Sequence, residues 1–364
     1  MSNLDKIRFT NEDWARSQAT WMQWWNGELD RPLVMAEYWH PASPELEGKV
    51  QGFVSNYPLT MPAAEVVDLH RRNLDRMECL GDSVPKWWIN FGPGIVAGFL
   101  GSRVVPKPNT VWFEPAQDVE LKDMHLRYDP ENIWLKRVME ITRLGVAELG
   151  DRAVIGHTDL GGNLDILASL RSSEKLLMDL LDCPEEVDRL CREISALWIR
   201  YYDELHAVIH QAGRGTAPWA AIWSPGRCYM MQSDFAYMIS PEHFAQFVVP
   251  DLTACCAVLD HGFYHLDGKG QIPHLDHLIG IERLRGIQWI PGDGMPPPAE
   301  WLPLLKRIRD GGKLCQLFVS SAGARTIVKN LGGKGFVFHI GDGKIKSRED
   351  MTAFQKLLRE DEPR

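Results

Sequence analysis

Residues 262–268 read Gly-Phe-Tyr-His-Leu-Asp-Gly, a short apolar run that ends in a His-x-Asp-Gly set. An apolar run of this length between glycines predicts a buried β-strand. Side chains alternate along a strand, so His265 and Asp267 are expected to point the same way at its carboxyl end. Two potential metal ligands on one face predict a functional site at that edge of the sheet.

Seven more runs of this kind alternate with longer helical patterns along the chain. The expected strands are 33–39, 85–91, 153–159, 219–223, 263–267, 287–290, 314–319 and 336–340. The expected helices include 62–80, 131–149, 173–212, 241–261, 299–310 and 322–331. Eight strands alternating with helices predict an α/β fold with a parallel sheet, and eight is the number that closes a (β/α)8 TIM barrel.

The 364 residues are expected to form a single domain. Residues 1–30 are interpreted as a helical cap, 31–341 as the barrel and 342–364 as a C-terminal helix. Residues 173–212 are long enough for a helical hairpin between strands three and four, broken at Asp182-Cys183-Pro184. An open doubly wound sheet is the alternative, but no GxGxxG motif follows the first strand.

Composition narrows the classes of partner. The net charge of −9 argues against a nucleic-acid backbone or an acidic membrane as partner. No apolar run approaches about 20 residues, so no membrane span is expected. The seven cysteines are scattered and form no CxxC pair, which favours a reduced, cytoplasmic protein without a disulfide framework.

Residues 240–250 follow the pattern Ser-Pro-x-x-Phe-x-x-Phe-x-x-Pro, within a longer matching stretch that starts at Ser233. This pattern resembles the uroporphyrinogen decarboxylase superfamily, which also contains methyltransferases acting on methylated corrinoid proteins. Residues 172–187 resemble the segment after the third strand in that group, and the order of parts fits from about Arg31 to Gly341. The resemblance implies a TIM barrel with its site at the carboxyl ends of the strands.

The first strand argues against the decarboxylase branch. Porphyrinogen decarboxylases carry an Arg-Gln-Ala-Gly-Arg segment there, whose arginines hold substrate carboxylates. Residues 35–40 instead read Met-Ala-Glu-Tyr-Trp-His, without arginine, and Glu37 would repel a polycarboxylate.

The methyltransferase branch has a zinc site built from His-x-Cys on the fifth strand and a cysteine on the eighth. The matching positions here hold His265, Asp267 and His339. The resemblance therefore implies a divalent metal on these three side chains, with zinc expected, although two imidazoles and a carboxylate also suit harder metals. It further implies a corrinoid carried by a partner protein as the methyl donor.

Other polar residues fall at predicted strand ends and are expected to line the site. The acid–base candidates are Glu37, His157 and Asp159; the candidate substrate contacts are Asn90, Trp223, Asp234 and Gln288. Each has a structural alternative: His157 and Asp159, for example, could instead cap the turn through Gly161-Gly162.

Aromatic residues are concentrated in the same regions. Those at strand ends or in the second loop are Trp87, Trp88, Phe91, Trp112, Trp223 and Trp289. Some are expected to wall an apolar cavity above the metal for an aromatic or methylated substrate. Alternatively, they seal the sheet against the amino-terminal helix, which has Trp14, Trp21, Trp24 and Trp25 of its own.

The sequence thus predicts a metal-dependent, methyltransferase-like enzyme acting on a small organic molecule. Two alternatives remain open: a decarboxylase or lyase with Asp159 or Glu37 as the acid–base group, and a non-catalytic barrel that binds a small molecule. A homodimer is also left open.

Overall fold

A computed structural model describes residue 7 and residues 9–363. Its strands are β1 (Leu33–Trp39), β2 (Met77–Gly81), β3 (Lys86–Trp88), β4 (Arg103–Lys107), β5 (Thr110–Glu114), β6 (Val154–Gly156), β7 (Cys228–Met231), β8 (His261–Asp267), β9 (Leu284–Ile290), β10 (Leu314–Val319) and β11 (Phe336–Ile340). Its helices are α1 (Asn11–Trp25), α2 (Ala63–Leu74), α3 (Val96–Phe99), α4 (Ile133–Leu149), α5 (Asn163–Arg171), α6 (Ser173–Asp182), α7 (Pro184–Ile209), α8 (Pro241–His243), α9 (Val249–Ala257), α10 (Leu275–Gly280), α11 (Leu302–Asp310), α12 (Ser321–Leu331) and α13 (Arg348–Glu360).

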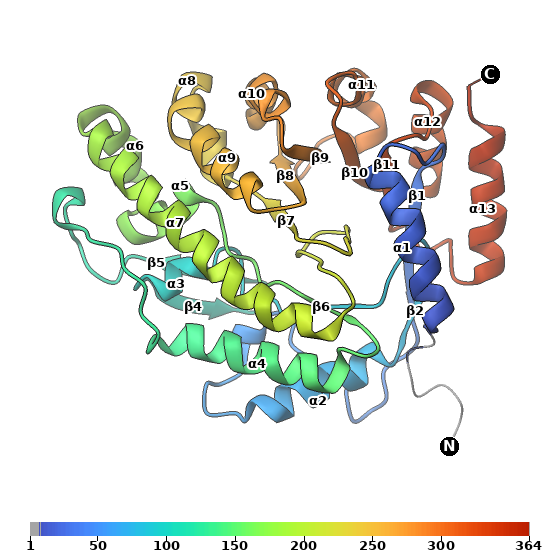
Figure 1. Ribbon diagram of the computed structural model, residues 1–364, viewed down its shortest axis with the longest axis horizontal. Coiled ribbons are helices and arrows are strands. Elements are labelled where there is room, and N and C mark those ends of the chain that lie inside the picture. The colour runs from blue at the N-terminus through green and yellow to red at the C-terminus, as the bar shows by residue number, and fades with distance from the viewer. Residues whose placement is uncertain (1–6, 8, 364) are drawn as a thin grey trace.

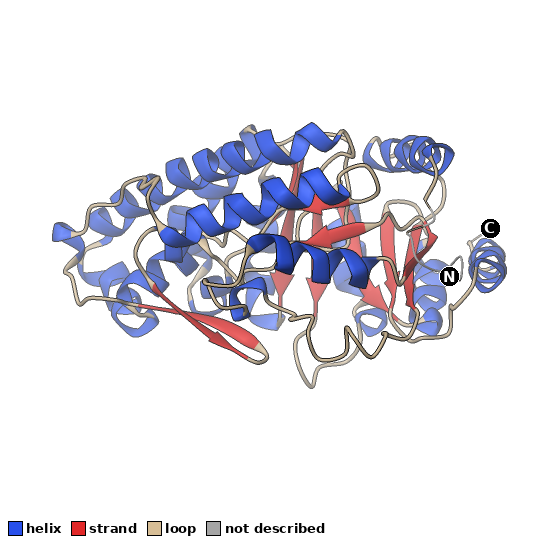
Figure 2. Ribbon diagram, turned by 90° about the horizontal axis from the view of Figure 1, so that it is seen from below, coloured by secondary structure: helices blue, strands red, loops and turns tan. Residues whose placement is uncertain are grey.

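Seven strands form one sheet in the order β2-β1-β11-β10-β9-β8-β7. All neighbouring pairs from β1 to β7 in that order are parallel, and only β2 runs antiparallel. The first and last predicted strands do pair, with Met35 opposite His339. The remaining strands form two separate pairs, the parallel pair β3–β6 and the antiparallel hairpin β4–β5. Figure 2 shows the hairpin at a distance from the main sheet.

The sheet buries both of its faces. Residues of the outer face, such as Tyr264, Leu317 and Phe338, belong to the large core formed with the helices. Figure 1 shows α9, α10, α11 and α12 along one outer side of β7–β11. The inner face, which carries Met35, Phe263 and other alternating residues, forms a second core with α1 and residues 217–223.

Helix α1 contributes four buried tryptophans to this inner core: Trp14, Trp21, Trp24 and Trp25. Thr10 and Asp13 cap its first turn reciprocally, which fixes where the helix begins. The indole N–H of Trp21 donates to the carbonyl of Asp82 at 3.0 Å. The indole N–H of Trp25 donates to the carbonyl of Trp223, also at 3.0 Å. These bonds satisfy buried donors and hold the helix against the sheet.

Two expected elements differ from the structure. Residues 219–223, predicted as the fourth strand, form no strand; the strand that follows α7 is β7, and residues 216–224 instead pack on the inner face. The helix expected over 62–80 ends at Leu74, and its last residues form β2 beside β1. In both cases a distant part of the chain decides the local structure.

Residues 173–212 do break at Cys183, into α6 and α7, with Pro184 at the first position of the second helix. Within the described part of the chain, no helix combines the length and the apolar character that crossing a membrane requires.

Candidate functional site

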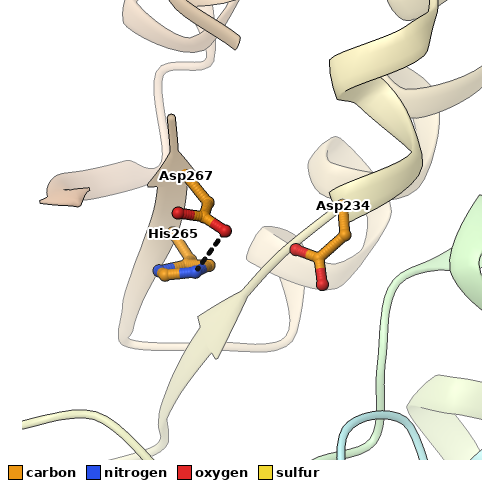
Figure 3. A group of neighbouring side chains, drawn as sticks. All are labelled: Asp234, His265 and Asp267. Atoms are coloured by element: carbon orange, nitrogen blue, oxygen red, sulfur yellow. Dashed lines mark ion pairs between the residues drawn. The ribbon is translucent and has the colours of Figure 1, made fainter. Parts of the chain in front are cut away.

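Three potential metal ligands meet at the carboxyl ends of β7 and β8 (Figure 3). His265 and Asp267 lie on one side of β8, with Nε2 of His265 3.9 Å from Oδ2 of Asp267. Asp234 begins the short helical turn after β7 and faces them. One ligand atom from each of the three side chains lies within 4.8 Å of the others. The period-2 argument from the sequence therefore brought His265 and Asp267 together correctly in space.

Two glutamine side chains orient the imidazole of His265 from the side away from the carboxylates. Its Nδ1 is hydrogen-bonded to Oε1 of Gln288, and Nε2 of Gln288 donates to Oε1 of Gln316. Because Gln288 uses its amide N–H toward Gln316, its carbonyl oxygen accepts the proton on Nδ1. The lone pair on Nε2 is then free and faces the two carboxylates, as in metal sites where a second partner fixes the histidine tautomer.

The carboxylates of this region repel one another. Burial raises the pKa of Asp234, and the neighbouring Asp267 raises it further, while only the protonated form of His265 would oppose the shift. Burial, together with Asp234, raises the pKa of Asp165 to about 7. The oxygens of Asp165 accept the backbone N–H groups of Asp234 and Phe235 at 3.0 and 2.7 Å, which fixes the turn carrying Asp234. A bound cation would relieve this repulsion.

The donor set fits a divalent cation. One imidazole nitrogen and two carboxylates are within reach of a single ion, and the set has no thiolate. Such nitrogen and oxygen ligands suit zinc and also harder ions such as manganese. The remaining coordination positions would be open to a substrate or to water.

His339 lies outside this group and pairs with Glu37. Nε2 of His339 is 2.6 Å from Oε2 of Glu37, and Ser83 donates to the other carboxylate oxygen at 3.2 Å. Burial alone would raise the pKa of Glu37, but the hydrogen bond from His339 and the charge of Lys86 bring it below its usual range. Two strands, β10 and β9, lie between β11, which carries His339, and β8.

Lys86 is a functional candidate that the sequence analysis missed. Its ammonium group donates to the carbonyls of Pro218 and Ala220, at 3.1 and 2.6 Å, and so pins residues 216–224 to the inner face. Burial lowers its pKa to about 8, against the opposing effect of Glu37. A lysine inside the apolar run around Trp87 and Trp88 was the available signal.

An aromatic cavity of about 230 Å³ opens beside the Glu37–His339 pair. Its walls are Met35, Trp39, Met77, Val84, Trp88, Trp219, Ala221, Ile222, Trp223 and Phe318, and its polar groups are Glu37, Lys86 and His339. The ring of Trp219 also contacts His265 edge-on, with centroids 4.9 Å apart, so it stands between the cavity and the carboxylate group.

Of the aromatic residues expected at a pocket, only Trp88 and Trp223 line this cavity. Trp87 stacks on His70, and Trp289 packs against Trp301. Phe91 is buried in the outer core, and Trp112 is exposed on the β5 strand. Trp39 and Trp219 line the cavity as well, although the sequence pattern did not indicate them.

The other predicted site residues have structural partners. Oδ1 of Asp159 accepts the backbone N–H of Gly161 at 2.9 Å, which is the turn-capping role considered as the alternative to catalysis. Burial raises the pKa of Asp159 to about 7. His157 stacks on Tyr202, with centroids 4.5 Å apart, and burial holds its pKa well below the usual range. Asn90 bridges the N–H of Gly92 and the carbonyl of Gly52.

Trp223 has both of the roles expected for the aromatic residues, since it walls a cavity and also seals the sheet against the amino-terminal helix. It lines the cavity and also contacts the tryptophans of α1, including Trp21 at a centroid distance of 6.2 Å. Its indole N–H donates to the carbonyl of Arg214 at 2.8 Å. Gln288 acts on His265, as described above, and not as a direct cavity wall.

These features define a mixed α/β protein with a parallel sheet and polar side chains at its carboxyl edge. The sequence matches no protein-family model and no curated protein. The fold is similar to that of a solved structure, a methyltransferase from Methanosarcina mazei, with a TM-score of 0.61. The match covers 94% of this chain and 98% of that chain at 14% sequence identity, so what the two share is the fold.

Proposed function

We propose that this chain is a metal-dependent, methyltransferase-like enzyme that transfers a methyl group to or from a small organic molecule. The observation that carries the proposal is the group formed by Asp234, His265 and Asp267 at the carboxyl ends of β7 and β8. The fold shared with a methyltransferase and the resemblance to the corrinoid-dependent branch of the uroporphyrinogen decarboxylase superfamily both support it.

The proposal includes a (β/α)8 barrel. The parallel pairing of β1 with β11 supports closure on one side. On the other side, Val154 of β6 is buried in the same inner core as Met230 of β7. The backbone N–H of His157 donates to the carbonyl of Ala217 at 2.9 Å, so residues 216–224 occupy the position beside β6 where a neighbouring strand would pair.

The residues that would hold the metal are Asp234, His265 and Asp267, with zinc as the first candidate. A bound divalent cation would lower the pKa of a thiol or hydroxyl bound to it and make that group a nucleophile. Gln288 keeps the lone pair of His265 directed at the ligand group. Trp219 packs edge-to-face against the imidazole, which limits the positions that the ring can take.

A corrinoid protein is the proposed methyl donor, and it would dock over the carboxyl edge of the sheet. Large apolar side chains are exposed there: Trp39 and Phe318 at the ends of β1 and β10, and Tyr237 and Met238 after β7. Exposed apolar side chains around a site are a common feature of docking surfaces.

Metal titration of the chelator-treated protein tests the proposal. The wild-type chain should bind one zinc ion, and His265→Ala or Asp234→Asn should weaken binding at least tenfold. His125→Ala removes an exposed histidine and should bind as the wild type does. Chelator-sensitive transfer of the methyl group from methylcobalamin to an added thiol, catalysed by the wild-type protein, would complete the test. Equal zinc affinity in His265→Ala and wild type would contradict the proposed site.

One observation favours the second candidate, a decarboxylase or lyase. Asp159 is buried and its pKa is raised to about 7, which suits a general acid near neutral pH. This candidate predicts turnover that resists chelators and is lost in Asp159→Asn.

A further inference from the structure

We infer that the aromatic cavity beside Glu37 and His339 is a binding site for a small uncharged molecule that carries an apolar ring and a hydrogen-bond donor, as a phenol does. None of the three proposed metal ligands lines this cavity. The inference therefore stands whether or not the chain is a methyltransferase.

The size and walls of the cavity suit a substituted ring. Its volume is about 230 Å³, and an apolar cavity of about 150 Å³ already accommodates benzene. The rings of Trp39, Trp88 and Trp219 provide flat, rigid walls. A ligand that fills this space would bury most of its surface, which is typical of small-molecule sites.

The charges in the wall are already compensated, which disfavours an ionic ligand. The ammonium group of Lys86 is engaged by the carbonyls of Pro218 and Ala220. The carboxylate of Glu37 is engaged by His339 and Ser83. Glu37 and Lys86 lie close enough for each to shift the pKa of the other, so the wall holds one negative and one positive group. An ionic ligand would add an unbalanced charge to this buried site.

The carboxylate of Glu37 retains the capacity to accept one more hydrogen bond. Each of its oxygens accepts one bond, from His339 at 2.6 Å and from Ser83 at 3.2 Å. A carboxylate offers about four lone-pair sites. A ligand hydroxyl would fill a remaining site with a charge-assisted bond, which is stronger than one between neutral groups. The indole N–H groups of Trp88 and Trp219, two lining residues, are buried without a partner. A hydroxyl suits this cavity because it can donate to Glu37 and also accept from such an N–H group.

Access is from the carboxyl edge of the sheet. Trp39 and Phe318 line the cavity, and their exposed fractions are 43% and 41%. Trp219 also lines the cavity and packs against His265 in an edge-to-face arrangement, with ring centroids 4.9 Å apart. A bound ring would therefore lie one indole away from the proposed metal ligands.

The test compares four probes by calorimetry on the full-length, chelator-treated protein: phenol, toluene, benzoate and benzylammonium. Phenol should bind at least tenfold more tightly than each of the other three. Equal binding of toluene would overturn the role of the donor. Tighter binding of benzoate or benzylammonium would overturn the uncharged class. No binding of phenol would overturn the site itself.

Two variants locate the binding. Ala221→Leu places a larger side chain in the cavity wall and should abolish phenol binding, whereas Ala353→Leu, on the exposed side of α13, should leave it unchanged. Glu37→Gln should reduce the preference for phenol over toluene at least threefold while toluene binding stays constant. Phenol binding that survives both cavity variants unchanged would place the site elsewhere. Because chelated protein is used, failure of the metal titration does not affect this result.

Discussion

Replacing Lys86 with methionine should change how the stability of the protein depends on pH. Lys86 is held against the carbonyls of Pro218 and Ala220, and burial lowers its pKa from 10.5 to about 8. The unfolded chain therefore holds this proton between about pH 8 and 10.5, whereas the folded chain releases it. Stability rises with pH wherever the unfolded state binds more protons. The wild type should therefore gain stability relative to Lys86→Met as the pH rises.

The size of this gain follows from the shift in pKa. Each unit corresponds to about 1.4 kcal/mol, so the full window is worth about 3 kcal/mol. Between pH 7 and pH 10 the expected change in the stability difference is about 2.5 kcal/mol.

Urea unfolding of the wild type, Lys86→Met and the control Lys356→Met measures this change at the two pH values. Lys356 lies on α13 with 79% of its side chain exposed, so its replacement should produce no comparable pH dependence. A stability difference for Lys86→Met that is constant within about 0.5 kcal/mol would refute the burial of its ammonium group.

Three further predictions concern buried or closely packed positions elsewhere in the fold. Burial raises the pKa of Asp251 from 3.8 to about 6, so between these pH values the folded chain keeps a proton that the unfolded chain has released. The stability of the wild type relative to Asp251→Asn should therefore fall by about 3 kcal/mol between pH 3 and pH 7, measured by urea unfolding at both pH values. A Cβ at Gly162 would lie 2.1 Å from the carbonyl oxygen of Gln232, so Gly162→Ala should destabilise the chain by about 1–3 kcal/mol, and an unchanged melting temperature would contradict this close approach. Trp21 is fully buried, so Trp21→Ala should lower the unfolding free energy by about 3–5 kcal/mol; Trp112, 58% exposed, offers the matched Trp→Ala control, which should change stability by less than about 1 kcal/mol.

The sequence predicted those parts of the fold whose pattern is local. Short apolar runs with turn residues at both ends located β1, β8, β10 and β11 within a few residues. The parallel arrangement followed from their alternation with helices. The break between α6 and α7 was equally visible, because Cys183 is followed by a proline that can begin a helix but not continue one.

The errors arose where a distant partner decides the structure. The run Trp-Ala-Ala-Ile-Trp at 219–223 has the length and composition of a buried strand. Lys86, more than a hundred positions away, instead donates to the carbonyls of Ala220 and of Pro218 just before the run. Residues 77–80 continue a helical pattern without a glycine or proline, yet they pair with the open edge of β1 as a strand. Neither partner can be read from a local window of sequence.

The same limit applies to the site. The sequence pattern grouped His265, Asp267 and His339, whereas in the structure His339 pairs with Glu37 and lies outside the group that contains His265 and Asp267. Met35 is paired with His339 across β1 and β11, so Glu37, two residues further along β1, has its side chain on the same face and next to this histidine. Glu37 therefore takes the Nε2 atom of His339, and Asp234 supplies the third ligand atom beside β8. The structure therefore has two separate polar centres: the Glu37–His339 pair, which lines the aromatic cavity, and the ligand group at the ends of β7 and β8. A chain of hydrogen bonds from His265 through Gln288 to Gln316 crosses the sheet from β8 over β9 to β10. It ends on the strand next to β11, which carries His339.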